Sequence, residues 1–155
     1  MPELPHRVRI ERTLDESPAA VWAVLADFAN IADWNGGVTT SHATGSHETV
    51  GVGAQRHCDL APMGELEETV LVWEPDQRMV ISIDSAKRIP VKRGEMTFEM
   101  SPADGGTAFV LDYGFQAKGG PIAPLVGRML TGQLEKGFSG FIDDLAAAAA
   151  NPTAA

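Results

Sequence analysis

Apolar and polar residues alternate along most of this 155-residue chain, and the pattern changes to helical periodicity near its C-terminal end. Alternation with period two is typical of half-buried β-strands. It predicts a first strand over residues 7–14, with Arg12 interrupting the apolar face. Because only short turns separate the segments that follow, they are predicted to pair as one antiparallel sheet. These segments are Val38–Ser46, Gly53–Leu60, Glu65–Trp73, Arg78–Ser85, Val91–Met100 and Thr107–Gln116.

Helical signals stand before and after this series of strands. Ser17 followed by Pro18 is typical of a helix start, with Ser17 as the N-cap and Pro18 in the first helical position. A second short helical segment is predicted over Phe28–Trp34, ending at the breaker Asn35-Gly36-Gly37. From Pro121 to Ala149 apolar residues recur every three or four positions, which predicts one amphipathic helix of about seven turns.

Four glycines interrupt this C-terminal helix, at Gly127, Gly132, Gly137 and Gly140. A glycine in a helix interior costs about 1 kcal/mol relative to alanine, so their presence needs an explanation. Close packing of the helix on the sheet is one explanation, and space left free for a ligand is the other.

The composition is that of an ordinary globular protein, with 44% apolar and 21% charged residues. Acidic residues outnumber basic ones by 21 to 12, for a formal charge of −9. An acidic surface repels phosphate backbones and anionic headgroups, so we expect neither nucleic acid nor a membrane as a partner. The single cysteine, Cys58, and the lack of a signal-peptide pattern favour the cytoplasm. We expect one domain over residues 1–150 and a disordered tail over 151–155.

One strand, two short helices, six strands and a long helix are the element order of the helix-grip fold. More specific likeness lies in residues 17–28 (SPAAVWAVLADF), 31–34 (IADW), 50–56 (VGVGAQR), 68–70 (ETV), 73–75 (WEP) and 106–107 (GT). On these segments the chain resembles the START/Bet v 1-like superfamily, also called SRPBCC or polyketide cyclase/dehydrase-like. One departure is Gly36, where relatives often carry proline after the tryptophan loop.

The resemblance implies an α+β fold, in which a curved antiparallel sheet of about seven strands wraps around the long C-terminal helix. It also implies a cavity between sheet and helix for lipids, hormones, polyketides or similar molecules. It implies no single activity, because the same fold serves carriers, receptors and cyclases.

Two charged residues interrupt otherwise apolar strand faces. Arg56 is the lone charge on one face of residues 54–60, and Glu68 is the lone charge on one face of residues 65–73. A hairpin centred near Pro62-Met63 makes them direct or diagonal cross-strand neighbours. If these faces point inward, the pair either orients a polar group of a ligand or is a structural ion pair that holds the strand register.

Further candidates for the cavity lining come from the last strands, the tryptophan loop and the C-terminal helix. Tyr113 shares a face with Phe109, and its hydroxyl is either a donor or general acid toward a ligand or a core hydroxyl. Trp34 either closes the mouth of the cavity or anchors the short helix to the core. The predicted ligand-binding residues are Arg56, Glu68, Tyr113, Trp34, Met96, Phe98, Phe109 and Met129.

No pattern typical of a metal, dinucleotide or nucleophile site is present. His57 and Asp59 alternate with Arg56 and are expected on the outer face. The other histidines lie in terminal or loop-like segments and lack metal-ligand spacing. Gly51-Val52-Gly53 precedes a strand instead of a helix, so it does not indicate a dinucleotide site. We therefore expect no metal and no cofactor.

The leading hypothesis is that the chain binds a small, largely apolar molecule, lipid-, polyketide- or aromatic-like, between sheet and helix. One alternative is a cyclase, hydratase or dehydratase acting on a polyketide-like or aromatic substrate, with Arg56, Glu68 and Tyr113 as acid–base groups. Another is a partner-binding module whose cavity is vestigial. An enzyme needs a usable proton deep in the cavity, whereas a vestigial cavity would be filled by side chains.

Overall fold

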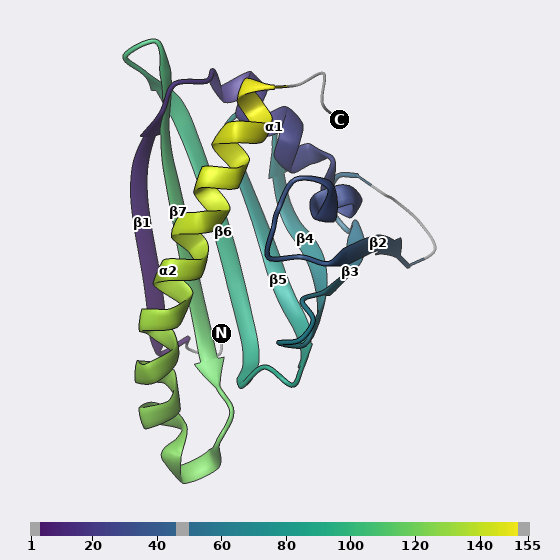
Figure 1. Cartoon of the computed structure of the whole chain (residues 1–155), viewed down its shortest axis with the longest axis vertical. Helices are drawn as coiled ribbons and strands as arrows, with labels where there is room; N and C mark the ends of the chain where they lie inside the picture. The colour runs from purple at the N-terminus through teal and green to yellow at the C-terminus, as the bar shows by residue number, and fades with distance from the viewer. Residues whose placement is uncertain (1–3, 46–49, 152–155) are drawn as a thin grey trace.

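The structure is a computed structural model and describes residues 4–45 and 50–151. A strand and two short helices precede a run of six strands, and a long helix ends the fold (Figure 1). The strands are β1 (His6–Leu14), β2 (Thr40–Thr44), β3 (Gln55–Asp59), β4 (Glu65–Glu74), β5 (Arg78–Lys87), β6 (Val91–Ala103) and β7 (Gly106–Ala117). The helices are α1 (Pro18–Ala26) and α2 (Ala123–Ala150), with 3₁₀ helices η1 (Phe28–Asp33) and η2 (Gly120–Ile122).

This element order confirms the predicted α+β helix-grip fold, and the boundaries lie within about three residues of the predicted ones. The N-terminal helix begins as expected, because the Ser17 hydroxyl accepts from the Ala20 amide at 3.2 Å. Strand β2 is shorter than predicted, because Val38 is buried and its amide donates to the Asn35 carbonyl within the preceding turn. Ser46 at the predicted end of that strand, His47 and residues 152–155 of the predicted tail lie outside the described residues.

All neighbouring strands of the sheet pair antiparallel, in the order β1-β7-β6-β5-β4-β3-β2. Strands β2 to β7 follow one another as a meander, and β1 joins the sheet beside β7. A two-residue turn, Asp104-Gly105, connects β6 to β7, with φ angles of 48° and 80°. Positive φ at both central residues suits the twist of a hairpin, which explains aspartate followed by glycine at this turn.

Helix α2 crosses the sheet obliquely and lies nearest to β1 and β7 (Figure 1). Gly127 permits this approach, because a Cβ atom there would lie 2.0 Å from Nε2 of His6 at the start of β1. Arg12 of β1 donates to Ser139 Oγ of α2 at 2.7 Å and also pairs with Asp143. The charge that interrupts the apolar face of the first strand therefore ties that strand to the helix.

The other half of the sheet is bordered by the short helices. Helix α1 packs against α2, and η1 lies against β2 and β3 (Figure 1). The side chains between α2, η1 and the strands β3 to β6 therefore determine whether a pocket remains under the long helix. Within residues 4–45 and 50–151, no helix combines the length and the hydropathy needed to cross a lipid bilayer.

Candidate functional site

Arg56 of β3 and Glu68 of β4 form a buried ion pair on the inner face of the sheet. They are direct partners in the antiparallel register, and Nε of Arg56 donates to Oε1 of Glu68 at 2.8 Å. Their side chains are only 7% and 9% exposed. The predicted pairing is confirmed, and the two opposite charges cancel within the sheet.

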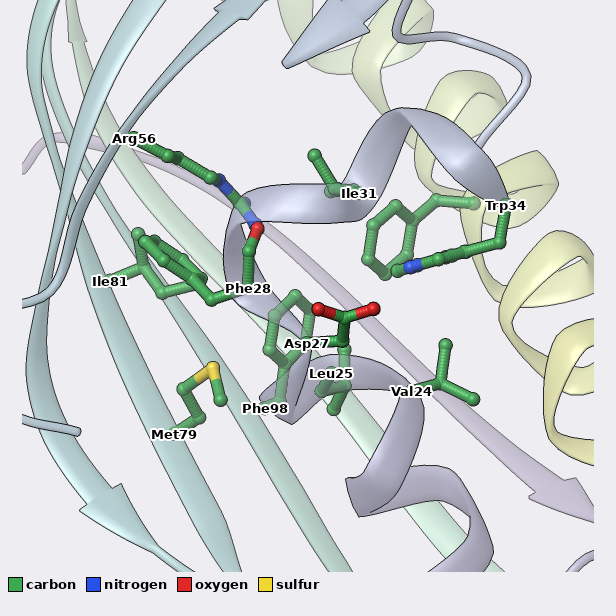
Figure 2. Close-up of a pocket in the computed structure, with 11 residues that line it drawn as sticks. Val24, Leu25, Asp27, Phe28, Ile31, Trp34, Arg56, Met79, Ile81 and Phe98 are labelled. Carbon is green, nitrogen blue, oxygen red and sulfur yellow. The ribbon is translucent and has the colours of Figure 1, made fainter. Parts of the chain in front are cut away.

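The guanidinium of Arg56 is fixed by further contacts. Its Nη1 donates to the main-chain carbonyl of Phe28 at 2.8 Å, and its central carbon lies 3.9 Å from the centroid of the Phe28 ring. Figure 2 shows Arg56 reaching from the sheet toward Phe28 in η1. Charge-assisted hydrogen bonds and a guanidinium stacked on an aromatic face together fix the orientation of this side chain.

Cys58 lies two residues along β3, on the same face as Arg56. Its Sγ donates to Oε1 of Glu68 at 3.5 Å. Burial raises the pKa of the Cys58 thiol to about 12, the Glu68 carboxylate adds to the increase, and Arg56 opposes it. The thiol therefore stays protonated near neutral pH and is a poor nucleophile.

A pocket of about 400 Å³ lies between the inner face of the sheet and α2, and Arg56, Cys58 and Glu68 form part of its wall. This volume is in the range of small-molecule sites. The remaining wall is mainly apolar and comes from β4 to β6, from α2 and from the loops around them. The apolar lining residues are Ile31, Val38, Leu60, Met63, Leu66, Ile81, Ile89, Pro90, Met96, Phe98, Leu130, Leu134, Phe138 and Phe141.

A much smaller void of about 10 Å³ adjoins this pocket (Figure 2). The lining residues common to both are Ile31, Arg56, Ile81, Phe98 and Phe141. Such a volume holds one water molecule at most, so it is no site for an organic ligand. Trp34 lines this void and not the larger pocket. Its ring packs edge-to-face on Phe141 with centroids 5.2 Å apart, so the indole connects the end of η1 to α2.

Four of the eight candidate residues line the larger pocket: Arg56, Glu68, Met96 and Phe98. Phe109 is fully buried and stacks on Phe98 with centroids 5.8 Å apart, so it belongs to the core beside the pocket. Tyr113 is also buried, and its hydroxyl oxygen faces β6, where a Cβ atom added to Gly94 would lie 2.6 Å from it. Tyr113 itself does not line the pocket, but its ring packs edge-to-face on the lining residue Phe138 with centroids 5.1 Å apart, so it lies directly behind the pocket wall.

The placement of Met129 in the lining is corrected by the structure. Met129 is 65% exposed, and it lies in a row with Ile122 and Leu125, which are each 59% exposed. The row of Leu130 and Leu134 faces the pocket instead. At this end of α2 the apolar stripe is wider than the face that the sheet covers. Helical periodicity alone therefore could not distinguish the exposed row of Met129 from the row that faces the pocket.

The helix glycines divide between the two explanations offered for them. Gly127 packs closely against His6, whereas a Cβ atom at Gly132, Gly137 or Gly140 would meet nothing within 4 Å. Of these three, Gly137 alone lines the larger pocket. Close packing therefore explains Gly127, and Gly137 keeps space open in the wall that α2 contributes.

The outer face of the same two strands carries His57, as predicted. Its Nε2 lies 3.1 Å from Oε1 of Glu65, and its Nδ1 is hydrogen-bonded to Glu67. His42 of β2 stacks on it with ring centroids 5.2 Å apart. The hydrogen bond to Glu67 is the main cause of a raised His57 pKa. In the part of the chain that the structure describes, no group of histidine, cysteine and acidic side chains has a metal-binding arrangement.

A separate pocket of about 390 Å³ lies between α1 and the end of α2. Its lining contains Trp34, several alanines and the carboxylates of Asp27, Asp33 and Asp144, and none of its lining residues comes from a strand. Because no strand contributes to it, this pocket is not the space between sheet and helix that the fold class implies. None of the buried polar residues Arg56, Glu68 and Thr107 lines it.

Nearly the whole chain matches one known protein family. The sequence model of the family described as polyketide cyclase / dehydrase and lipid transport matches residues 5–150. The chain belongs to this family. As a member of the polyketide cyclase/dehydrase and lipid transport family, it also belongs to the START/Bet v 1-like superfamily that its motifs indicated. No curated protein sequence matches it significantly.

Solved structures of other proteins share the fold of this chain. A protein from Thermus thermophilus, TTHA0849, has a TM-score of 0.76 at 16% identity, with 92% of this chain and 96% of that one covered. The Zhui aromatase/cyclase from a Streptomyces species has a TM-score of 0.74 at 16% identity, covering 95% and 94%. Ara h 8.0201 has a TM-score of 0.73 at 11% identity, covering 93% and 97%. At such identities these neighbours establish the fold of this family member and no more.

Several lining residues of this family member were not selected from the sequence. Leu130, Phe138 and Phe141 belong to the apolar residues that recur every three or four positions in α2. This spacing could have predicted that they face the sheet. The loop residues around Met63 and Ile89 also reach the pocket, and no periodicity marks them.

Proposed function

We propose that this chain binds a small, largely apolar molecule in the pocket between the sheet and α2, with Arg56 and Glu68 contacting the ligand's polar group. One observation carries this proposal: a pocket of about 400 Å³ with mainly apolar walls contains a buried, fixed ion pair. Apolar walls with a few precisely placed polar groups are the usual composition of a small-molecule site. The family description, which includes lipid transport, agrees with this assignment.

The enzymatic alternative has less support from the site. The pKa of the Cys58 thiol is raised to about 12, and burial raises that of Tyr113 as well, so neither side chain gives up a proton near neutral pH. Glu68 already accepts from both Arg56 and Cys58. A vestigial cavity also has less support, because side chains leave the space between sheet and helix open.

A neutral fluorescent probe, N-phenyl-1-naphthylamine, tests the proposal in the full chain. Its emission increases when it enters an apolar site, so a titration gives a dissociation constant. Gly137→Leu places a side chain in the pocket and should weaken probe binding about tenfold or more, since it removes the space that the ligand needs.

Gly132→Leu is the matched control. It makes the same chemical change in the same helix, at a position where an added Cβ also meets nothing within 4 Å but which does not line the pocket. Both variants should fold, because leucine is a better helix former than glycine. Equal probe affinity in the two variants, or no binding to the unmodified chain, would count against a ligand site under α2.

A further inference from the structure

We propose that Glu68 makes this pocket select neutral, hydroxyl-bearing ligands and reject anionic ones. This inference rests on the proposed function and specifies the charge of the ligand. It starts from the charges at the pocket wall. Arg56 and Glu68 are both buried and are joined at 2.8 Å, so their charges already cancel. A carboxylate or sulfonate entering beside them would remain uncompensated in a poorly solvated space.

The donors of Arg56 that an anion would need are partly occupied. Nε donates to Glu68 and Nη1 donates to the Phe28 carbonyl. Among the described residues, Nη2 has no hydrogen-bond partner. The paired donors that bind a carboxylate most strongly are therefore not all free, whereas a single hydrogen bond to a neutral oxygen remains possible.

Glu68 offers the complementary group. Its Oε1 accepts from both Arg56 and Cys58, and within the described part of the chain its Oε2 has no partner. A hydroxyl group both donates and accepts, so it can bind Glu68 and Arg56 at the same time. A carboxylate only accepts, and it would meet the like charge of Glu68.

Two further features are consistent with this selection. Phe98 and Phe141 stack with an interplanar angle of 4° and centroids 5.5 Å apart, and both line the pocket, which suits an aromatic skeleton. Arg88 also lines the pocket, but its side chain is 63% exposed and lies 3.8 Å from Glu65. Solvent and this neighbour screen its charge, so it does not offset the negative charge of Glu68.

A series of naphthalenes of similar size tests the proposal by displacement of N-phenyl-1-naphthylamine at pH 7. The series contains 1-naphthol, which is neutral, 1-methoxynaphthalene, which accepts but does not donate, and 1-naphthoate, which is an anion. We expect 1-naphthol to bind the unmodified chain about tenfold more tightly than 1-naphthoate, with 1-methoxynaphthalene between them.

The decisive variant is Glu68→Gln, which keeps the shape of the side chain and removes its charge. It should raise the affinity for 1-naphthoate about tenfold, because Arg56 is then left without a counter-charge. It should also weaken 1-naphthol binding, because an amide oxygen is a weaker acceptor than a carboxylate, so the preference for 1-naphthol falls. Glu67→Gln is the matched control, since it removes the same charge from the neighbouring position of β4, where the side chain pairs with His57 on the outer face.

The possible results separate the two proposals. An unmodified chain that binds 1-naphthoate as tightly as 1-naphthol overturns the charge selection and leaves the proposed function standing. The same conclusion follows if Glu68→Gln and Glu67→Gln change the ratio of the two affinities equally. If no probe of the series binds, the proposed function fails and the selection fails with it. If Glu68→Gln does not fold, the ligand series on the unmodified chain still tests the selection, because equal affinity for 1-naphthol and 1-naphthoate overturns it.

Discussion

Arg56 contacts Phe28 in two ways: its Nη1 donates to the Phe28 carbonyl at 2.8 Å, and its guanidinium lies 3.9 Å from the centroid of the Phe28 ring. Phe28 is the first residue of η1 and lines the small void beside the pocket, and Arg56 belongs to β3. One buried side chain therefore connects the edge region of the sheet to the short helix, in addition to its ion pair with Glu68.

Removing either member of this ion pair should destabilise the fold. Arg56→Met leaves the Glu68 carboxylate buried without a counter-charge, which should lower the free energy of unfolding by about 3–5 kcal/mol. Adding Glu68→Leu should recover much of this loss, because an apolar pair replaces a charged one. Urea unfolding of the two single variants and the double variant gives the coupling energy. A coupling near zero would show that the two side chains do not interact in solution.

Much of this site followed from alternation alone. Period two fixes which residues share a strand face, and the Pro62-Met63-Gly64 turn limits the register, so Arg56 and Glu68 were predictable as direct or diagonal neighbours. The structure shows that they are direct partners. Their burial was expected because each is the lone charge on an apolar face.

Contacts that depend on how the elements pack could not be predicted from the sequence pattern. The rotation of α2 decides whether Met129 or Leu130 faces the sheet, and both fit an apolar stripe of helical period. Tyr113 points toward Gly94 of the neighbouring strand and packs on Phe138 of α2, and alternation along its own strand predicts neither contact. The hydrogen bond from Arg56 to Phe28 joins residues that no local pattern relates.

Two alanine substitutions in α2 should have opposite effects on stability. At Gly127 the new Cβ would lie 2.0 Å from Nε2 of His6, so the histidine ring must move from its position beside Phe115. We expect Gly127→Ala to destabilise the protein by about 1–3 kcal/mol. At Gly140 an added Cβ meets nothing within 4 Å, so Gly140→Ala should stabilise it by up to about 1 kcal/mol.

Thermal and urea unfolding of both variants measure this difference. The double variant His6→Ala with Gly127→Ala identifies the cause, because the smaller side chain at position 6 removes the contact. If Gly127→Ala is equally destabilising with and without His6→Ala, the close approach of helix and strand is not the reason for the glycine.

Stability should depend on pH through His57. The hydrogen bond to Glu67 raises the His57 pKa above its ordinary 6.5, burial opposes the increase, and the charges of Glu67 and Glu65 add to it. A proton held more tightly in the folded state stabilises the fold fully below pH 6.5. That contribution is lost as the pH rises through the raised pKa.

The measurement is the free energy of unfolding of the unmodified chain and of His57→Gln between about pH 5.5 and pH 9. The difference between the two should be largest at the acidic end and shrink as the pH rises. Glu67→Gln removes the main cause of the raised pKa, so it should reduce the same pH dependence. A difference that grows toward alkaline pH contradicts the role assigned to this histidine.

Cys58 should report on the pocket, because it lines the wall beside Arg56 and Glu68. Burial and the Glu68 carboxylate raise the pKa of its thiol from an ordinary 9.0 to about 12, and the residue is 1% exposed. At pH 8 the thiolate fraction is therefore about a hundredfold or more below that of an ordinary cysteine. Methyl methanethiosulfonate should label the native protein at least about a hundredfold more slowly than the urea-unfolded chain.

The labelling rate also tests where a ligand binds. Glu68→Gln removes a charge that raises the thiol pKa, so it should speed the labelling of the native chain, and Glu67→Gln should do so less, since its charge contributes less. Saturating 1-naphthol should slow labelling in both variants, because a ligand beside Arg56 covers the route to Sγ of the cysteine. Probe binding that leaves the labelling rate of Glu68→Gln unchanged would place the ligand elsewhere, and the pocket between α1 and the end of α2 would then be the site to examine.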